Sequence, residues 1–303
     1  MKFIAIIFAL IVVSAIMVVI LRRPKHNTSA ASPQQPARDV VALTKHLFRD
    51  AISVRHTTDV TRSYFGGRPP AALGLTWPMR EERPLSFLAC IDCSELPRSE
   101  HLNWLPERGC LLFFYDMVDQ VWGFDPKDRG GAITVYLAPD DVASSSGPLS
   151  PPTPLPADCD LKQRHIAFSL ISLPPSWETD EIQSLGLVDA EVDSLIDIRA
   201  ELYGDGPHHQ IGGFPDPIQT PEMDLECQLV TNGLYCGDPS GYNDPRAANL
   251  RAGAKDWSLL FQMDSDDDME LMWGDVGMIY FWVKREEARK LDFSNAWLIQ
   301  QCH

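Results

Sequence analysis

The amino-acid sequence predicts an α+β fold that is mainly antiparallel β-sheet, with a few flanking helices, an internal duplication and one transmembrane helix at the N-terminus. Three observations indicate this class. Residues 3–21 form an uncharged apolar run, and after residue 64 short apolar and aromatic runs alternate with Gly, Pro and Asp, as in strands joined by tight turns. Three short patterns of the first half also recur in the second half in the same order.

The first element is a predicted membrane anchor over residues 1–23. Its apolar run, residues 3–21, is close to the length that an α-helix needs to cross a hydrocarbon layer of about 30 Å. A cleaved signal peptide is the alternative, but its apolar stretch usually has about 7–15 residues and ends at a small-residue cleavage site. Here the basic segment 22–25 follows instead. We therefore predict a single-pass membrane protein whose membrane contact is made by residues 3–21.

The flanking charges predict that the soluble domain lies in the cytoplasm. Arg22, Arg23 and Lys25 follow the apolar run, whereas Lys2 alone precedes it, and basic residues next to a membrane span tend to stay on the cytoplasmic side. The seven cysteines are odd in number and lack the spacing of a disulfide framework. This pattern also favours a reducing compartment.

The charge of the chain argues against nucleic acid as a partner. The formal net charge is −16, and without residues 1–25, which hold four basic and no acidic residues, it becomes −20. A domain this acidic repels nucleic acid and anionic lipid. The charge fits a role in solubility alone, and it also fits a basic partner. The sequence has no Gly-x-Ser-x-Gly elbow, phosphate-binding loop or His-Glu-x-x-His motif, so hydrolase and nucleotide-binding functions lack support and no cofactor is predicted.

A polar linker over residues 24–38 is predicted to join the anchor to one domain over residues 39–303. A Ser- and Pro-rich connector at residues 143–157 separates the first half of this domain, residues 39–142, from the second half, residues 158–303. Apolar residues at helical spacing predict helices over residues 40–53, 179–185 and 189–203. Short apolar runs predict strands over residues 85–91, 110–115, 133–137, 166–173, 227–230, 257–263, 269–273, 278–283 and 297–301.

The repeated patterns are short, and they share one order. Each half has a Gly-Gly-x-Pro element, then an apolar strand that begins with Ser and ends with Asp, then an aromatic strand led by Gly. One such match could arise from strand composition alone, but three in the same order favour a true duplication. The matched segments are residues 66–69 with 212–215, residues 86–92 with 258–264, and residues 109–114 with 277–282.

At these residues the chain resembles the YwqG-like family of bacterial proteins of unknown function. The resemblance covers most of the chain after the linker, and it implies an α+β fold dominated by antiparallel sheet and no established reaction. Where the family usually has Gln before Ile-Asp, this chain has Cys90, whereas Gln262 keeps that residue in the second copy. A function carried by that Gln would therefore be lost from the first half. The resemblance is carried by residues 66–69, Trp77-Pro78, residues 85–96, residues 105–116, residues 213–219, Asp264-Ser265-Asp266 and residues 273–277.

The candidate binding site is a groove shared by the two repeats. Trp77 and Trp273 would supply aromatic walls, and nearby carboxylates would orient a ligand. The Gly-Gly-x-Pro elements have a structural alternative, because glycine reaches backbone conformations closed to other residues and proline fixes the next turn. The candidate groove residues are Trp77, Gly213, Pro215, Gln219, Gln262, Asp264, Asp266, Trp273 and Asp275.

Asp264, Asp266 and Asp268 are weak candidates for a cation site. They alternate as oxygen ligands do in calcium loops, but Met269 stands where such a loop needs Gly, and Asp275 instead of Glu occupies the last ligand position. Solvated hairpin residues explain the three carboxylates better. The sequence therefore assigns no metal site.

Two further pairs also have a simpler structural explanation. Cys90 and Cys93 have the spacing of a redox pair or of half a zinc site, but no second pair with that spacing follows. Small buried residues explain them. His208 and His209 could serve as ligands or as a general base, and a surface turn explains them more simply.

Two functional hypotheses follow. The first is a non-enzymatic, membrane-anchored YwqG-like binding domain with a protein partner, of which an immunity or antitoxin-like role is one version. The second is an enzyme or a metal-dependent ligand binder that uses the loops at residues 264–268 and 273–275. The lack of a catalytic signature favours the first hypothesis, and no catalytic residue is assigned.

Overall fold

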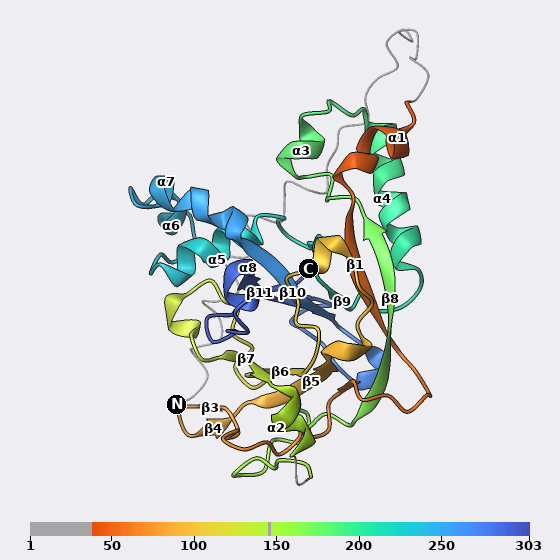
Figure 1. Ribbon diagram of the computed structural model, residues 1–303. Helices are drawn as coiled ribbons and strands as arrows, with labels where there is room; N and C mark the ends of the chain where they lie inside the picture. The colour runs from red at the N-terminus through yellow and green to blue at the C-terminus, as the bar shows by residue number, and fades with distance from the viewer. Residues whose placement is uncertain (1–37, 145–146) are drawn as a thin grey trace, which may run out of the picture. The chain divides into compact units, whose positions relative to one another are not determined.

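The computed structural model describes residues 38–144 and 147–303, which are organised around one antiparallel sheet (Figure 1). The sheet has ten strands in the order β12-β11-β10-β9-β1-β8-β2-β5-β6-β7. A separate two-stranded hairpin consists of β3 (Met79–Arg80) and β4 (Arg83–Pro84). The strands of the main sheet are β1 (Arg49–His56), β2 (Tyr64–Phe65), β5 (Ser86–Asp92), β6 (Cys110–Tyr115), β7 (Ala132–Leu137), β8 (Arg164–Leu173), β9 (Gln210–Ile211), β10 (Trp257–Asp264), β11 (Met278–Lys284) and β12 (Trp297–Gln301).

The strand order is symmetrical about the central pair β1 and β8. Exchanging β1 with β8, β2 with β9, β5 with β10, β6 with β11 and β7 with β12 gives the same order read from the other end. β1 of the first half pairs with β9 of the second half, and β8 pairs with β2 in return. The register shifts at matching places, between Phe87 and Ala89 and between Leu259 and Phe261. This symmetry agrees with the repeated patterns, and each half needs a strand of the other to complete its part of the sheet.

The two Gly-Gly motifs occupy matching positions in this framework. Gly66 and Gly67 have φ angles of +61° and +70°, and Gly212 and Gly213 have φ angles of +67° and +70°. Residues with a side chain rarely adopt this left-handed region. A Cβ atom on Gly213 would also lie 2.5 Å from the Cβ atom of Ala51 on β1. Glycine is therefore required where the chain leaves β9 and passes close to β1.

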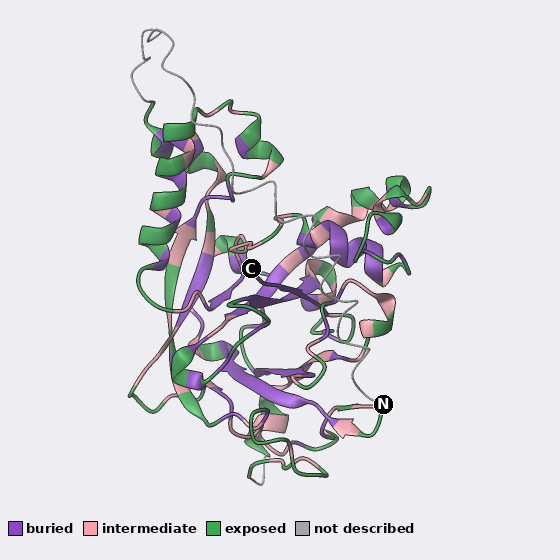
Figure 2. Cartoon of the chain, turned by 180° about the vertical axis from the view of Figure 1, so that it is seen from behind, coloured by how far each residue is buried: buried purple, intermediate pink, exposed green. Residues whose placement is uncertain are grey.

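The central core lies between the inner faces of the two halves of the sheet. Phe113 on β6 packs against Phe261 on β10 and Phe281 on β11, with ring centroids 4.8 and 5.1 Å apart. Tyr115 and Trp273 meet edge to face, with centroids 5.6 Å apart. Every residue of β5 and β6 is buried, and Figure 2 shows buried residues concentrated in the strands. Removing these rings from water stabilises the contact between the two halves.

The two halves differ in what covers their outer faces. In the second half α5 (Met223–Thr231) packs there, and its Leu229 shares a buried cluster with Trp257 and Tyr280. In the first half a loop covers this face, and Trp77 packs edge to face on Phe114.

The other described helices are α1 (Val40–Thr44), α2 (Pro139–Ala143), α3 (Asp180–Gln183), α4 (Asp189–Tyr203), α6 (Ser240–Asn243), α7 (Ala247–Leu250) and α8 (Arg285–Ala288), with 3-10 turns η2 (Lys45–Leu47), η3 (Cys93–Glu95), η4 (Glu100–Leu102), η5 (Pro126–Asp128), η6 (Arg251–Asp256) and η7 (Asp267–Met269).

Three predicted elements are wrong in type or extent. The helix predicted over residues 40–53 ends at Thr44, and β1 begins at Arg49, because this segment is buried as a central strand and not as one face of a helix. Residues 227–230 belong to α5. A short run that is apolar at every position does not distinguish a buried strand from a buried helix. Residues 269–273 form no strand, apart from an isolated bridge at Leu271.

The predicted transmembrane helix and the membrane localisation are corrected. Across residues 38–144 and 147–303, no helix has both the length and the apolar character needed to span a membrane. The predicted span, residues 3–21, and most of the linker lie outside the described residues. The single-pass topology and the membrane contact therefore have no support in the structure.

Candidate functional site

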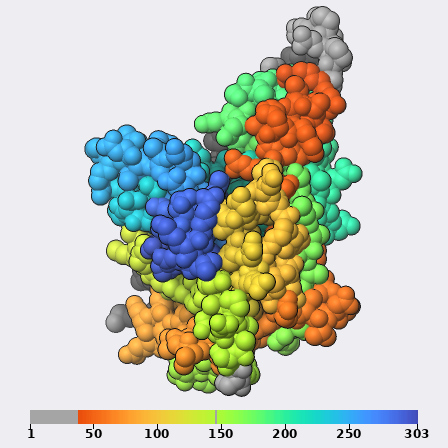
Figure 3. Space-filling view, viewed as in Figure 1, coloured from red at the N-terminus to blue at the C-terminus, as the bar shows by residue number. Residues whose placement is uncertain are grey.

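A cavity of about 710 Å³ opens beside the second Gly-Gly motif. Its walls come from the start of β1, from β10 and β11, from α3 and the start of α5, and from residues 213–215. Figure 3 shows the surface hollowed between the light-blue segment that contains η6 and the orange-red segment at the start of β1. Pockets for small ligands commonly have volumes of about 300–1,000 Å³, so the cavity has a suitable size.

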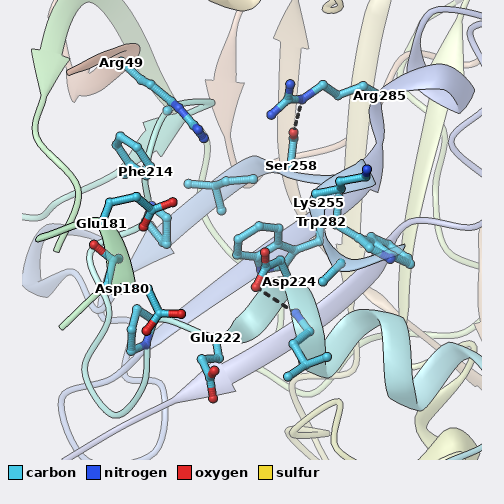
Figure 4. A pocket seen from close by; sticks show the side chains of 18 of the residues that line it. Arg49, Asp180, Glu181, Phe214, Glu222, Asp224, Lys255, Ser258, Trp282 and Arg285 are labelled. Atoms are coloured by element: carbon cyan, nitrogen blue, oxygen red, sulfur yellow. Dashed lines mark hydrogen bonds between the residues drawn. The ribbon is translucent and has the colours of Figure 1, made fainter. Parts of the chain in front are cut away.

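Two guanidinium groups face this cavity from separate elements. Arg49 begins β1 and Arg285 follows β11, and Figure 4 shows both side chains turned toward the cavity. The Arg49 guanidinium lies over the ring of Phe214, 4.3 Å from its centroid. Arg285 donates a hydrogen bond from Nε to Oγ of Ser258 at 2.5 Å. Among the described residues neither guanidinium hydrogen-bonds to a carboxylate.

The two guanidinium groups also act on each other. The Arg49 side chain is exposed to solvent. Its guanidinium group nevertheless lies against the cavity walls, which replace part of the water around its charge. Burial lowers the pKa of Arg49, and the positive charge of Arg285 lowers it further. The carboxylates of Glu181 and Asp224 act in the opposite direction. The cavity therefore holds two like charges close together, an arrangement that an anion would stabilise.

Carboxylates line the wall that faces these arginines. Glu181 comes from α3, and Glu222 and Asp224 come from the start of α5 (Figure 4). Burial raises the pKa of Asp224, and the charges of Glu222 and Glu181 add to the effect. The carboxylate of Asp224 accepts a hydrogen bond from the backbone N–H of Leu225 at 2.8 Å. The cavity thus has Arg49 and Arg285 on one side and carboxylates from α3 and the start of α5 on the other, and η6 adds the basic residues Arg251 and Lys255 to its wall.

A polar network behind the cavity fixes the segment that lines it. The buried Gln262 accepts a hydrogen bond from the backbone N–H of Asp216 at 2.8 Å and donates one to the carbonyl of His208 at 2.7 Å. The ring of His208 stacks on Tyr203, with centroids 4.2 Å apart, and its Nδ1 lies 2.7 Å from Oδ2 of Asp216. Burial would raise the pKa of Asp216, but the hydrogen bond from His208 and the charge of Arg199 outweigh burial and lower it. Gln262 therefore holds both ends of the turn that contains the Gly-Gly motif.

A second polar cluster joins β1, β9 and the loop after β10. Oδ2 of the buried Asp266 lies 2.6 Å from Nε2 of His56 and 3.1 Å from Nε2 of His209. Oδ1 of Asp266 accepts a hydrogen bond from the backbone N–H of Asp268 at 2.9 Å. Burial would raise the pKa of Asp266, but the hydrogen bonds from His209 and His56 outweigh burial and hold it well below its usual range. Burial also lowers the pKa of His209.

This cluster has metal-ligand side chains, but its hydrogen bonds do not fit a metal site. The nearest ligand atoms of His56, His209 and Asp266 lie within 4.8 Å of one another. Nδ1 of His209 accepts a hydrogen bond from the backbone N–H of Asp264 at 3.1 Å, so in the neutral ring Nε2 carries the proton. Nδ1 of His56 is buried and has no partner among the described residues. Metal-binding histidines usually donate the other ring N–H to an acceptor, and neither ring does so here.

The structure does not bring the predicted groove residues together. Gly213 and Pro215 line the cavity. Trp77 is buried in the other half and donates from Nε1 to the carbonyl of Leu85 at 2.8 Å. Trp273 is fully buried in the central core, and Nε1 donates to the carbonyl of Asp264 at 3.1 Å. The two tryptophans therefore support the fold from the inside and do not form the walls of one groove.

The remaining predicted residues have separate partners. Asp264 accepts a hydrogen bond from the backbone N–H of His208 at 2.8 Å, while Asp266 binds the two histidines and Asp268 is exposed. These three carboxylates do not converge on one point. Gln219 donates to the carbonyl of Cys302 at 2.8 Å, and Asp275 is exposed in the loop before β11. Gln262 acts as a structural bridge, as its hydrogen bonds show.

Arg49 and Arg285 were not identified from the sequence. Arg49 lies within the helix predicted over residues 40–53, and Arg285 lies two residues beyond the strand predicted over residues 278–283, with no motif around it. The two arginines face one cavity because β1 is exchanged between the halves, which places the start of β1 near β10 and β11 through β9. Sequence spacing carries no information about that exchange.

The fold and the cavity define a domain of mainly antiparallel sheet, built from two similar halves, with a charged pocket whose walls come from both of them. The chain belongs to the family described as "Domain of unknown function (DUF1963)", which matches residues 63–302. No curated protein matches the chain. The family match includes both Gly-Gly motifs and every strand of the main sheet except β1.

Proposed function

We propose that this chain is a ligand-binding protein whose cavity holds an anionic group, such as a carboxylate or a phosphate, between Arg49 and Arg285. The observation that carries the proposal is the pair of guanidinium groups that face one cavity without a carboxylate hydrogen bond among the described residues. An anion placed between them would offset the burial and the repulsion by Arg285, which together lower the pKa of Arg49. The anionic group can belong to a small molecule or to a protein partner.

The local geometry supports binding at this position. Gly212 and Gly213 turn the chain so that Phe214 lies beneath Arg49. Contact between a guanidinium and an aromatic face restrains the arginine side chain and leaves its N–H groups free to donate. Ser258 restrains Arg285 through Nε, so its terminal N–H groups also stay free for a ligand. The arginines are therefore held in position before a ligand arrives.

The second hypothesis from the sequence gains no support from this geometry. A metal-dependent site at Asp264, Asp266 and Asp268 would need carboxylates that converge, whereas Asp264 accepts from the backbone of His208, Asp266 binds the two histidines and Asp268 is exposed. We also propose that the chain is a YwqG-like member of its family, which the Gly-Gly-x-Pro and Trp-Gly-Asp motifs support. A YwqG-like protein should then have the same symmetrical order of ten strands, and a different order would contradict the assignment.

The binding proposal is tested with the full chain, adipate and inorganic phosphate, in titration calorimetry and thermal unfolding at constant ionic strength. A ligand that prefers the folded state raises its stability, by about 2.7 kcal/mol at a free concentration of about 100 times Kd. We expect Arg285→Met to reduce the affinity at least about tenfold. Arg108→Met, which removes an exposed arginine away from the cavity, is the matched control and should change nothing. No binding of either anion, or equal losses in both variants, would contradict the proposal.

A further inference from the structure

We infer that the ligand of this cavity is a zwitterion, with its anionic group between Arg49 and Arg285 and a cationic ammonium or guanidinium group against Asp224 and Glu181. This inference rests on the proposed function and adds the second charge of the ligand. It depends on the separation of charge across one cavity, which Figure 4 shows as arginines on one side and carboxylates on the other.

The acidic wall lacks a cationic partner from the chain. Among the described residues, the carboxylates of Glu181, Glu222 and Asp224 form no ion pair with a basic side chain. Arg251 and Lys255 on η6 line the same cavity and are exposed, but among the described residues they make no ion pair with these carboxylates either. By contrast, Asp116, away from the cavity, is held by two arginines. Asp116 therefore has two counter-ions, whereas among the described residues this wall has no ion pair, and Glu181 and Asp224 interact with Arg49 only through longer-range electrostatics.

The partial burial of Asp224 strengthens the argument. Taking a carboxylate out of water is costly unless a cation or hydrogen-bond donors replace the water. The carboxylate of Asp224 interacts with the backbone N–H groups of Leu225 and of Asp224 itself, and it has like-charged neighbours at Glu222 and Glu181. A cationic group on a ligand would provide the missing partner at this point. The same group would be repelled at the arginine side, so the ligand has only one favourable orientation.

The two walls also discriminate between classes of ligand. A dianion satisfies the arginines but places its second charge against Asp224, and a dication is repelled by Arg49 and Arg285. Only a ligand with charges of both signs gains at both walls. The cavity volume of about 710 Å³ has room for a molecule between an amino acid and a short peptide in size. The zwitterion can thus be a free amino-acid-like molecule or the C-terminus of a peptide that ends in a basic residue.

The experiment compares three series of probes of equal chain length on the full chain by titration calorimetry. The series are straight-chain ω-amino acids of about four to eight carbons, the dicarboxylates of the same lengths and the diamines of the same lengths. We expect at least one ω-amino acid to bind about tenfold more tightly than its matched dicarboxylate and diamine. A blocked peptide that ends in lysine, compared with the best ω-amino acid, identifies whether the source is a peptide or a free molecule.

Variants separate this inference from the proposed function. Asp224→Asn should weaken the best ω-amino acid about tenfold while it leaves the dicarboxylate unchanged or binding more tightly. Asp197→Asn, which removes an exposed carboxylate on α4 away from the cavity, is the matched control and should have no effect. If every dicarboxylate binds at least as tightly as its ω-amino acid and Arg285→Met abolishes that binding, the inference is overturned and the anion site stands. Equal weakening of both probes by Asp224→Asn also overturns the inference.

Discussion

The two halves of the sheet share one strand framework and use its outer face differently. In the first half the face is closed by apolar packing, and Trp77, Phe87, Cys90 and Phe114 belong to one buried cluster. In the second half α5 covers only part of the matching face, and the charged cavity remains beside it. In this symmetrical framework one half of the sheet is therefore closed by packing, while the matching face of the other half is left partly open.

Matched residues show how this difference arises. Arg68 and Phe214 are the third residues of the two Gly-Gly-x-Pro elements. Arg68 is already paired, with Nη2 donating to Asp160 at 2.8 Å, whereas Phe214 lies beneath Arg49. Where the second half has the hydrogen-bonding Gln262, the first half has a buried cysteine. The first half thus has an internal ion pair and a buried thiol where the second half has a cavity-lining aromatic ring and a hydrogen-bonding amide.

The largest expected effect concerns Glu226, on a helix that only the second half has. Burial raises the pKa of its carboxyl to about 8, against an ordinary value of 4.5, and Oε2 has no described partner. Between about pH 4.5 and pH 8 this carboxyl is protonated in the folded protein and ionised in the unfolded chain, so unfolding releases its proton. The free energy of unfolding therefore falls by about 1.4 kcal/mol for each pH unit as the pH rises through this range. Glu226→Gln should remove this pH dependence. The free energy of unfolding of the variant, minus that of the unmodified chain, should therefore be roughly 2–4 kcal/mol larger at about pH 8 than at about pH 5. Urea unfolding across this range measures it.

The control for that prediction is Glu201→Gln, an exposed glutamate on α4. Its free energy of unfolding should depend on pH in the same way as that of the unmodified chain. Identical slopes for Glu226→Gln and the unmodified chain would show that this carboxyl ionises normally in the folded protein.

The next effect compares Gln262 with Cys90. Gln262→Leu leaves the N–H of Asp216 and the carbonyl of His208 without their partner, and should lower the free energy of unfolding by about 2–4 kcal/mol. Cys90→Ala removes only a small apolar group and should cost about 1 kcal/mol. Urea unfolding of both variants at neutral pH checks the difference. Equal losses would mean that the two positions have the same role after all.

A smaller difference is expected between the glycines of the two motifs. Gly67 and Gly213 have the same φ of +70°, so alanine is strained at both. At Gly213 the new Cβ meets Cβ of Ala51 at 2.5 Å, whereas at Gly67 it meets the flexible side chain of Gln163 at 2.9 Å. Gly213→Ala should cost about 2–3 kcal/mol and Gly67→Ala about 1–2 kcal/mol. Thermal unfolding ranks the two, and the reverse order would contradict the close packing against β1.

The smallest effect concerns the paired and unpaired arginines. Arg68 and Asp160 keep about a third of their side-chain surface in solvent, so Arg68→Met should lower stability by at most about 1 kcal/mol. Arg49→Met removes a repulsive charge and should leave stability unchanged or slightly higher. Chemical unfolding without added anions measures both. A loss at Arg49 larger than that at Arg68 would show that Arg49 already has a stabilising partner.

The sequence predicts the framework better than the site. Apolar periodicity locates the helix over residues 189–203, and the repeated Gly-Gly motifs indicate the two similar halves. The site depends on contacts between residues that lie far apart in the chain. These contacts arise because β1 and β8 are exchanged between the halves. The aromatic residues Trp77 and Trp273 also misled the prediction, because an aromatic side chain serves a core and a groove equally well.

The central claim is that the open half of the sheet binds an anion between Arg49 and Arg285. A crystal structure of the full chain soaked with adipate tests it most directly. The account predicts carboxylate oxygens within about 3 Å of both guanidinium groups, with Phe214 still beneath Arg49. An adipate bound elsewhere, or arginines paired with Glu181 and Asp224 across a closed cavity, would contradict it.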